Sequence, residues 1–310
     1  MDTFSNSQYS GLISELLNDT QYIKISNRGK LAGLRNHAEV LVRKILNIGN
    51  NYKLMLGQIK INSDNQAVVD GLNNLGEELR DKLIEIVKKI NVLGREGAHT
   101  QHVGKFSNDQ IKCVEDAILE LYSLMFIRYF TKIKISIYSD PRVLRLFSLL
   151  PPIIRYKTWD YLFQIDKNNI QIVDKLCLSI IKLYDKKVAY EWLEDNSEII
   201  KAISYPNEEC IEYYDMIHSI EICPGIYVSE VSLDFNNYNN MYDLLYAKIC
   251  DNRTSINESG KMYKNFEEAK EHYIEEVKKY SDISDKEFLD LMEFAYIGRK
   301  SISEQNNLDC

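Results

Sequence analysis

The sequence of 310 residues predicts a mainly α-helical protein, in which a helical bundle is followed by a helical region with one β-hairpin. Glycine and proline are scarce, at 13 and 5 residues, which favours helices over a turn-rich β architecture. Apolar residues also recur at helical spacing along most of the chain. The pattern changes after residue 135, so we expect two domains, residues 1–135 and residues 136–310.

The first domain is expected to begin with a short helix over residues 12–17. A longer amphipathic helix follows, and either Ser26 or Asn27 can cap its start. Gly49 is a candidate for its end, because glycine is common just beyond a helix C-terminus. Residues 50–75 are polar and interrupted, and predict a connector with short helical pieces at most.

Two further long helices complete the predicted bundle. The first carries an apolar stripe that ends at Gly94, and this glycine is expected to stop the helix. Residues 94–106 (GREGAHTQHVGKF) then form a loop. The last helix begins at a capping box, with Ser107 at the N-cap and Gln110 three positions later, and continues to about Phe130.

The second domain reads as paired helices with one strand signal. Asp140 followed by Pro141 predicts a capped helix start, and the two prolines at 151–152 divide two helical segments. Near residues 217–235, two β-branched runs flank a Pro-Gly dipeptide and predict the hairpin. Two helices close the chain.

The charge is unevenly distributed along the chain, whose net charge is −8. Residues 1–135 carry 18 Lys and Arg against 15 Asp and Glu, whereas residues 136–310 carry 20 against 31. The acidic second half argues against nucleic acid wrapped over the whole surface. The slightly basic first half leaves room for a local anion site there.

The remaining bulk features predict a cytoplasmic protein with no membrane contact. The N-terminal residues lack the basic and apolar pattern of a signal peptide, and the apolar run LYSLMFIRYF is too short to span a bilayer and contains Arg128. Six dispersed cysteines, without metal-ligand spacing, are expected to be buried packing residues in a reducing compartment. No metal or other cofactor is expected.

Residues 93–102 (LGREGAHTQH) concentrate the chemically capable side chains, including two of the five histidines. In a helix, Arg95, His99 and His102 would share one sector, and in a glycine-hinged turn they could still converge. An imidazole can take the proton of a ribose 2′-OH while arginine offsets charge on the phosphorane. The alternative is structural: Arg95 and Glu96 form surface ion pairs, and His99 closes the loop with a backbone hydrogen bond.

The helix RNHAEVLVRKIL, the helix LRDKLIEIVKKINVLGREGAH and the capped helix after them resemble the HEPN superfamily (higher eukaryotes and prokaryotes nucleotide-binding) over residues 25–132. The resemblance is to the HEPN-like domain found beside prokaryotic restriction and defence modules. Catalytic members have an arginine, four to six residues, and a histidine. Three residues separate Arg95 from His99 and six separate Arg95 from His102, so the spacing favours His102 as the base.

The resemblance implies a prokaryotic or phage-linked defence protein that handles RNA or a nucleotide, acting as a metal-independent endoribonuclease. It also implies a homodimer through residues 25–132, and places Arg35 and Glu96 along the same RNA-binding cleft. Two alternatives stand beside this interpretation. Arg35 can belong to an exposed polar face, and the whole chain can be a non-catalytic interaction module that docks a protein partner through its acidic C-terminal region.

Two other clusters have competing interpretations. Glu268, His272 and either Glu275 or Glu276 share a helical face that could bind a divalent metal or could be a solvated charged face. The tyrosine-rich segment 205–246 could be a docking surface or an ordinary amphipathic region. The phosphate-binding GxxxxGK[ST] pattern and the GxSxG and HExxH patterns are absent, so common nucleotide-triphosphatase, hydrolase and metalloprotease functions lack motif support.

Overall fold

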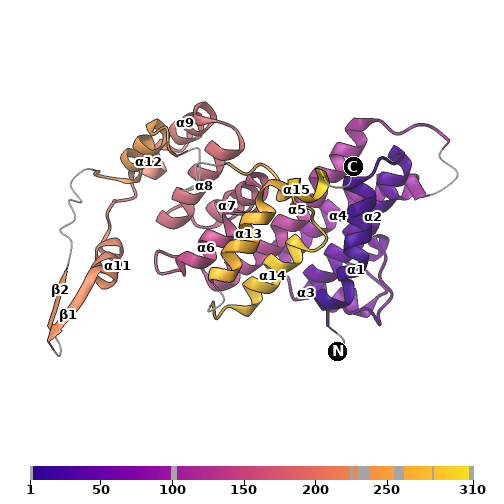
Figure 1. Ribbon diagram of the computed structural model, residues 1–310, viewed down its shortest axis with the longest axis horizontal. Coiled ribbons are helices and arrows are strands. Elements are labelled where there is room, and N and C mark those ends of the chain that lie inside the picture. The colour runs from indigo at the N-terminus through magenta and orange to yellow at the C-terminus, as the bar shows by residue number, and fades with distance from the viewer. Residues whose placement is uncertain are drawn as a thin grey trace.

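The chain folds mainly into helices, as predicted (Figure 1). The computed structural model describes residues 3–98, 103–223, 226–229, 238–254, 262–280 and 283–306. The helices of the N-terminal part are α1 (Asn6–Leu17), a π-helical turn (Asn18–Tyr22), α2 (Asn27–Leu46), a 3₁₀ turn (Leu56–Gln58), α3 (Gln66–Asn73), α4 (Glu77–Ala98) and α5 (Asn108–Ile133). Those of the C-terminal part are α6 (Pro141–Phe147), α7 (Pro152–Ile165), α8 (Ile170–Leu183), α9 (Lys186–Asp195), α10 (Ser197–Lys201), α11 (Glu208–His218), α12 (Met241–Cys250), α13 (Phe266–Lys279), α14 (Lys286–Tyr296) and α15 (Ile302–Asn306).

Helix α2 is bounded by local signals at both ends. The Ser26 side chain accepts a hydrogen bond from the Gly29 backbone N–H, which satisfies one of the unpaired donors of the first turn. The helix ends at Leu46 because Asn47 adopts the left-handed conformation, with φ of 55°. The predicted end at Gly49 was therefore two residues too late.

Helix α4 runs through Gly94 to Ala98, so the prediction that Gly94 stops it was wrong. Gly94 and Gly97 are buried on the side of α4 that faces α2. A Cβ atom at Gly94 would lie 2.7 Å from Cβ of Arg35, and one at Gly97 would lie 2.9 Å from Cβ of Leu31. The two glycines are therefore sites of close helix approach, and the predicted loop is shorter than residues 94–106.

We expect Gly94→Ala to lower the free energy of unfolding by about 1–3 kcal/mol, because the added methyl group forces α2 and α4 apart. Gly11→Ala is the matched control, since Gly11 lies inside α1 with nothing within 4 Å of an added Cβ. There the gain in helix propensity should stabilise the chain by about 0.5–1 kcal/mol. Urea unfolding of both variants measures these changes in unfolding free energy, which are expected to have opposite signs. If both variants are more stable than wild type, the close contact between α2 and α4 at Gly94 is contradicted.

Helix α5 is the central element of the fold. It starts at the predicted capping box, in which Ser107 accepts from the Gln110 N–H and the Gln110 side chain accepts from the Ser107 N–H. It packs against α2 and α4 on one side and against α7 on the other. Tyr122, Phe126 and Phe130 are fully buried along it, which is why this helix is apolar on most of its surface.

The C-terminal part starts at the predicted cap, where the Asp140 side chain accepts from the Arg142 N–H and Pro141 occupies the first helical position. Strand β1 (Ser219–Cys223) pairs antiparallel with β2 (Ile226–Ser229), and residues 224–225 between them lie outside the described part. Figure 1 places the two strands at the opposite end of the molecule from α1.

The last helices return to the N-terminal ones (Figure 1). The Asn6 side-chain amide donates to the Asp290 carbonyl at 2.9 Å and to the Glu293 carboxylate at 2.8 Å. One cluster of buried apolar residues extends from Tyr9 to Tyr296 and crosses residue 135 without a break. The division into domains 1–135 and 136–310 stays a prediction.

Two bulk expectations can be compared with the described residues. Cys177 and Cys210 are buried, as expected, but Cys113 and Cys250 are exposed, so packing does not explain those two thiols. Within the described ranges, every helix is too short or too polar to cross a bilayer.

Candidate functional site

The end of α4 and the facing start of α2 form an arginine-rich surface. Arg95 is exposed on the last turn of α4, and within the described residues it makes no ion pair. Arg28 of α2 reaches the carbonyl oxygens of Glu96 and Gly97 at 3.4 and 3.3 Å. Because the last carbonyls of a helix lack intrahelical donors, Arg28 caps the C-terminus of α4 and adds positive charge there.

Arg35 lies about two turns beyond Arg28 on α2. Its aliphatic stem packs on Gly94, and its Nη1 atom forms an ion pair with Glu39 at 3.2 Å. Its side chain is 22% exposed and its buried Nε atom has no hydrogen-bond partner. Arg35 is therefore partly buried and packs against α4, and its role in an RNA-binding cleft stays a prediction.

The structure brings together only part of the predicted site. Arg95 and Glu96 lie on α4, and Arg35 packs against that helix, as the predicted cleft requires of it. His99 and His102 lie outside the described residues, so their position relative to Arg95 stays a prediction.

His37, which follows Arg35 and Asn36 in the sequence, lies in a different environment. It is fully buried, and its Nε2 atom lies 3.1 Å from the Tyr122 hydroxyl of α5. The Arg299 guanidinium donates to the same hydroxyl at 3.4 Å. Tyr122 can therefore accept from Arg299 and donate to a neutral His37.

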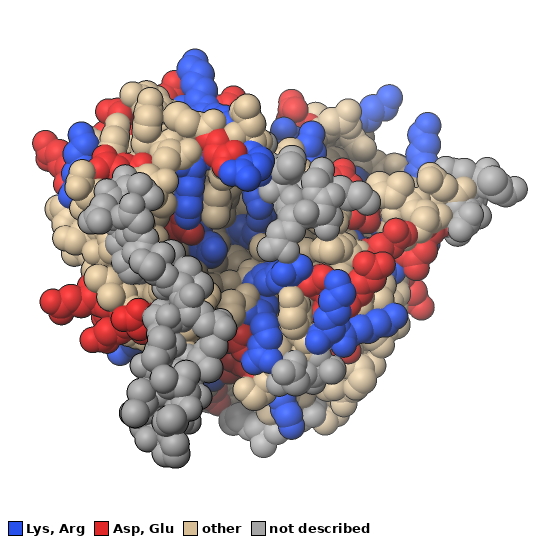
Figure 2. Space-filling model, turned by 60° about the vertical axis from the view of Figure 1, so that its left-hand side comes forward, with Lys and Arg blue, Asp and Glu red and all other residues tan. Residues whose placement is uncertain are grey.

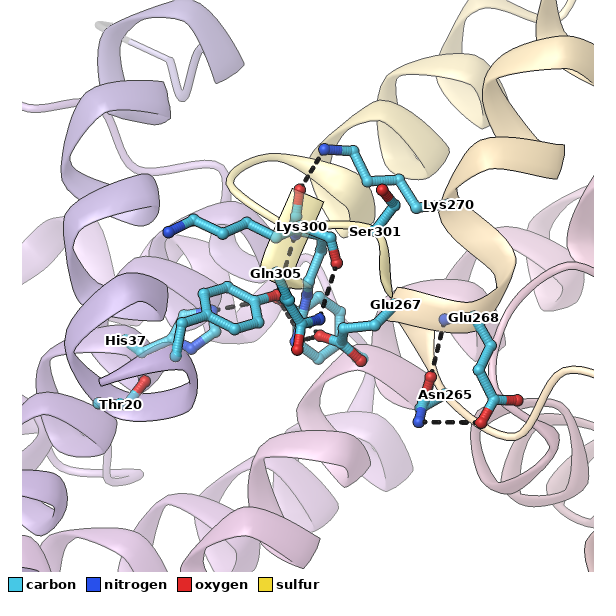
Figure 3. Close-up of polar contacts among 12 residues, drawn as sticks. Thr20, His37, Asn265, Glu267, Glu268, Lys270, Lys300, Ser301 and Gln305 are labelled. Carbon is cyan, nitrogen blue, oxygen red and sulfur yellow. Dashed lines mark hydrogen bonds and ion pairs between the residues drawn. The ribbon is translucent and has the colours of Figure 1, made fainter. Parts of the chain in front are cut away.

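The buried network continues into the C-terminal helices. Arg299 forms an ion pair with Glu267 at 3.5 Å, and the Tyr22 hydroxyl donates to the same carboxylate at 2.8 Å. In Figure 3, His37 belongs to the N-terminal helices and Glu267 to the C-terminal ones. Their side chains point toward the same central region between these helices. Arg299 also stacks over Phe266, 4.1 Å from the ring centre. The network joins the two predicted domains.

Burial lowers the pKa of His37 to about 3, and the nearby Arg299 charge lowers it further in the same direction. His37 is therefore neutral at physiological pH. With its imidazole 1% exposed and its Nε2 bonded to Tyr122, it has no access to a substrate. This histidine is a structural group, although the sequence places it beside Arg35.

The buried imidazole makes stability depend on pH. Below pH 6.5 the unfolded chain binds a proton at this position, whereas the folded chain does not until about pH 3. The folded state is therefore destabilised as pH falls through this window, by about 2 kcal/mol at pH 5 relative to pH 7.5. Urea titrations of wild type and His37→Gln at both pH values measure this effect. We expect the difference in unfolding free energy between the two proteins to be smaller at pH 5 than at pH 7.5 by that amount. A difference independent of pH would contradict the neutral, buried assignment.

The predicted metal cluster on α13 does not form a metal site in the described residues, because its side chains make other contacts. Glu276 is buried and bonds to Arg145 and Lys279, while the Glu268 carboxylate accepts from the Lys264 backbone N–H and from the Asn265 side-chain amide. His272 stacks on Tyr263, and its Nδ1 atom lies 3.9 Å from the Glu275 carboxylate. The described residues contain no group of His, Cys, Asp and Glu side chains that could hold a metal ion. The tyrosine-rich segment 205–246 is described only in part.

Sequence reasoning missed the Tyr122–Arg299–Glu267 network. Its members lie far apart in the chain, and each fits an ordinary local pattern: Tyr122 belongs to an apolar stripe, and Arg299 follows the last long helix. The one signal in the sequence that could have found this network is the spacing of His37, three residues after Leu34 and four before Leu41, which places it on the buried face of α2. No family model matches the chain, and no curated protein or solved structure matches it.

Proposed function

We propose that the chain is a defence protein whose N-terminal helices bind RNA at the end of α4 and cleave it without a metal ion. The observation that carries the proposal is the exposed Arg95 at the last turn of α4, beside two arginines of α2 that pack against the same turn. RNA phosphates are bound by such clusters of guanidinium groups, which match their geometry and charge.

In this proposal the attacking group is the ribose 2′-OH. His102 takes its proton while the 2′-oxygen forms a bond to phosphorus and the bond to the 5′-oxygen breaks. Arg95 donates to the phosphorane oxygens, where negative charge develops, and the leaving 5′-oxygen takes a proton from solvent water. Arg35 and Glu96 line the RNA path. His99 has a structural role.

A homodimer through residues 25–132 belongs to the same proposal, because two copies of the motif would then face one groove. Two exposed apolar side chains that lie on either side of Arg95 in the sequence fit such an interface. Val92 of α4 is 53% exposed and Val103 is 94% exposed. Covering these side chains would remove apolar surface from water.

The test is an RNA cleavage assay with the full chain, in EDTA and in added Mg²⁺, with single-stranded DNA of the same sequence as the control. We expect equal RNA cleavage in both buffers and none of the DNA, because the DNA lacks the attacking 2′-OH. Cleavage that is lost in EDTA would overturn the mechanism. Absence of cleavage, with RNA binding also absent, would favour the alternative of a non-catalytic module that docks a protein.

A further inference from the structure

A cavity of about 480 Å³ lies between α6, α7, α8, the middle of α13 and the residues before α13, far from Arg95 in the sequence. Five of its lining residues carry a basic side chain, and none carries a carboxylate: the basic ones are Arg145, Arg155, Lys175, Lys182 and His272. Figure 2 shows Lys and Arg side chains around a hollow at the centre of the face turned to the viewer. The concentration is notable because residues 136–310 as a whole are acidic.

Arg155 is a buried cation in the lining of this cavity. Its side chain comes from α7, it is only 6% exposed, and its buried Nε atom has no hydrogen-bond partner. No carboxylate pairs with it in the described part of the chain. A buried guanidinium without a counter-charge is expensive, so its retention points to a ligand that supplies the missing charge.

The neighbouring cations are also incompletely neutralised. Burial lowers the pKa of Lys182 to about 8, and the positive charges of Arg155 and Lys175 lower it further. Lys175 lies 3.7 Å from Asp174, but that carboxylate bonds more closely to Lys248. Arg145, by contrast, is paired with Glu276 at 2.8 Å. The positive charge without a carboxylate partner therefore comes from Arg155 and Lys182. Lys175 adds to it in part, because it shares Asp174 with Lys248.

The rest of the wall is apolar and aromatic. Leu144 and Phe147 of α6 and Leu178 of α8 line it, and Tyr263 stacks on His272 with ring centres 5.6 Å apart. Ligand pockets of roughly 300–1,000 Å³ that combine an apolar lining with a few charged groups bind small organic molecules. An aromatic ring can stack on Tyr263 while an anionic group reaches the cations.

We propose that this cavity binds a nucleoside diphosphate, with Arg155, Lys175 and Lys182 on the phosphates and Tyr263 against the base. Two to three positive charges match the two to three negative charges of that ligand class. The proposal is independent of RNA cleavage at α4, because no residue of the cavity belongs to the resemblance over 25–132. Either proposal can fail without the other.

The test is isothermal titration calorimetry of the full chain at pH 7 with ADP, inorganic pyrophosphate and adenosine as probes. We expect ADP to bind at least about tenfold more tightly than either of the others, since each lacks one half of the contacts. Wild-type protein that does not bind ADP would overturn the proposal. Pyrophosphate that binds as tightly as ADP would overturn the role of the aromatic wall, and hence the nucleotide class.

Variants separate a ligand contact from a structural one. Lys182→Met should weaken ADP binding about tenfold or more, because it removes a charge-assisted contact. Lys187→Met, at an 82% exposed lysine of α9, should leave the affinity unchanged. Arg155→Met should weaken binding while leaving the melting temperature equal or higher, since it removes an uncompensated buried charge. If Lys182→Met binds ADP as tightly as wild type, the proposal is contradicted. The same holds if Arg155→Met binds ADP as tightly as wild type but melts at a lower temperature.

Discussion

Arg95→Ala is expected to lower the rate of RNA cleavage by about 10²–10³, the effect typical of losing one donor to a developing oxyanion. The unfolding free energy should stay within about 0.5 kcal/mol of wild type, because Arg95 is exposed and outside the core. Lys88→Ala, at another exposed basic position of α4, is the matched control and should leave cleavage unchanged. Equal activity of the Arg95 and Lys88 variants would remove Arg95 from the site.

The two histidines can be separated in the same assay. The spacing from Arg95 predicts that His102→Ala loses cleavage and that His99→Ala retains it. The opposite pattern would mean that the adjacent Ala98-His99 pair marks the site better than the arginine spacing does. Retention of activity in both variants would contradict an imidazole base from this segment.

Arg299→Met is expected to lower the free energy of unfolding by about 3 kcal/mol, the largest loss of stability that the contacts described here predict. The change leaves the partly buried Glu267 without its guanidinium partner and removes one donor from the Tyr122 hydroxyl. The cation–π contact with Phe266 is lost as well. Urea unfolding measures the effect.

The matched control is Arg253→Met. Arg253 pairs with Asp251, but its side chain is 87% exposed, so the pair is screened by solvent and its loss should change the unfolding free energy little. Similar small losses in both variants would mean that the buried network does not hold the C-terminal helices against α2 and α5.

Helix starts were predictable where a short sequence carries its own cap. Ser107 with Gln110 and Asp140 with Pro141 begin helices as expected, and Ser26 is the cap out of the two candidates, Ser26 and Asn27; in each case the capping side chain bonds to a backbone N–H two or three residues away. Such contacts depend on neighbouring residues only. The amphipathic patterns of α2 and α4 likewise gave helices with one buried apolar face.

Gly94 was misjudged because its role depends on another helix. Glycine has a low helix propensity, which favours a stop, but α2 approaches α4 so closely that a side chain at Gly94 would collide with Arg35. Tertiary packing overrides the local preference. The same limit applies to His37, whose partners Tyr122 and Arg299 lie 85 and 262 residues away in the chain.

The candidate sites differ in how visible they are in the sequence. Arg95 stands in a dense local motif, so its residue types and spacing drew attention to it. The cationic cavity has no such motif, because Arg155 and Lys182 lie on different helices and the surrounding sequence is acidic. Only the packing of α7 against α8 brings the two cations to one cavity.

The chemistry of the cleaved ends tests metal-independent RNA cleavage at α4 most directly. A synthetic RNA is digested by the full chain in EDTA, and the masses of the fragments are measured. Attack by the 2′-OH predicts 5′ fragments that end in a 2′,3′-cyclic phosphate and 3′ fragments that begin with a 5′-hydroxyl. Fragments with a 3′-hydroxyl and a 5′-phosphate would require attack by water, and would contradict the proposed roles of Arg95 and His102.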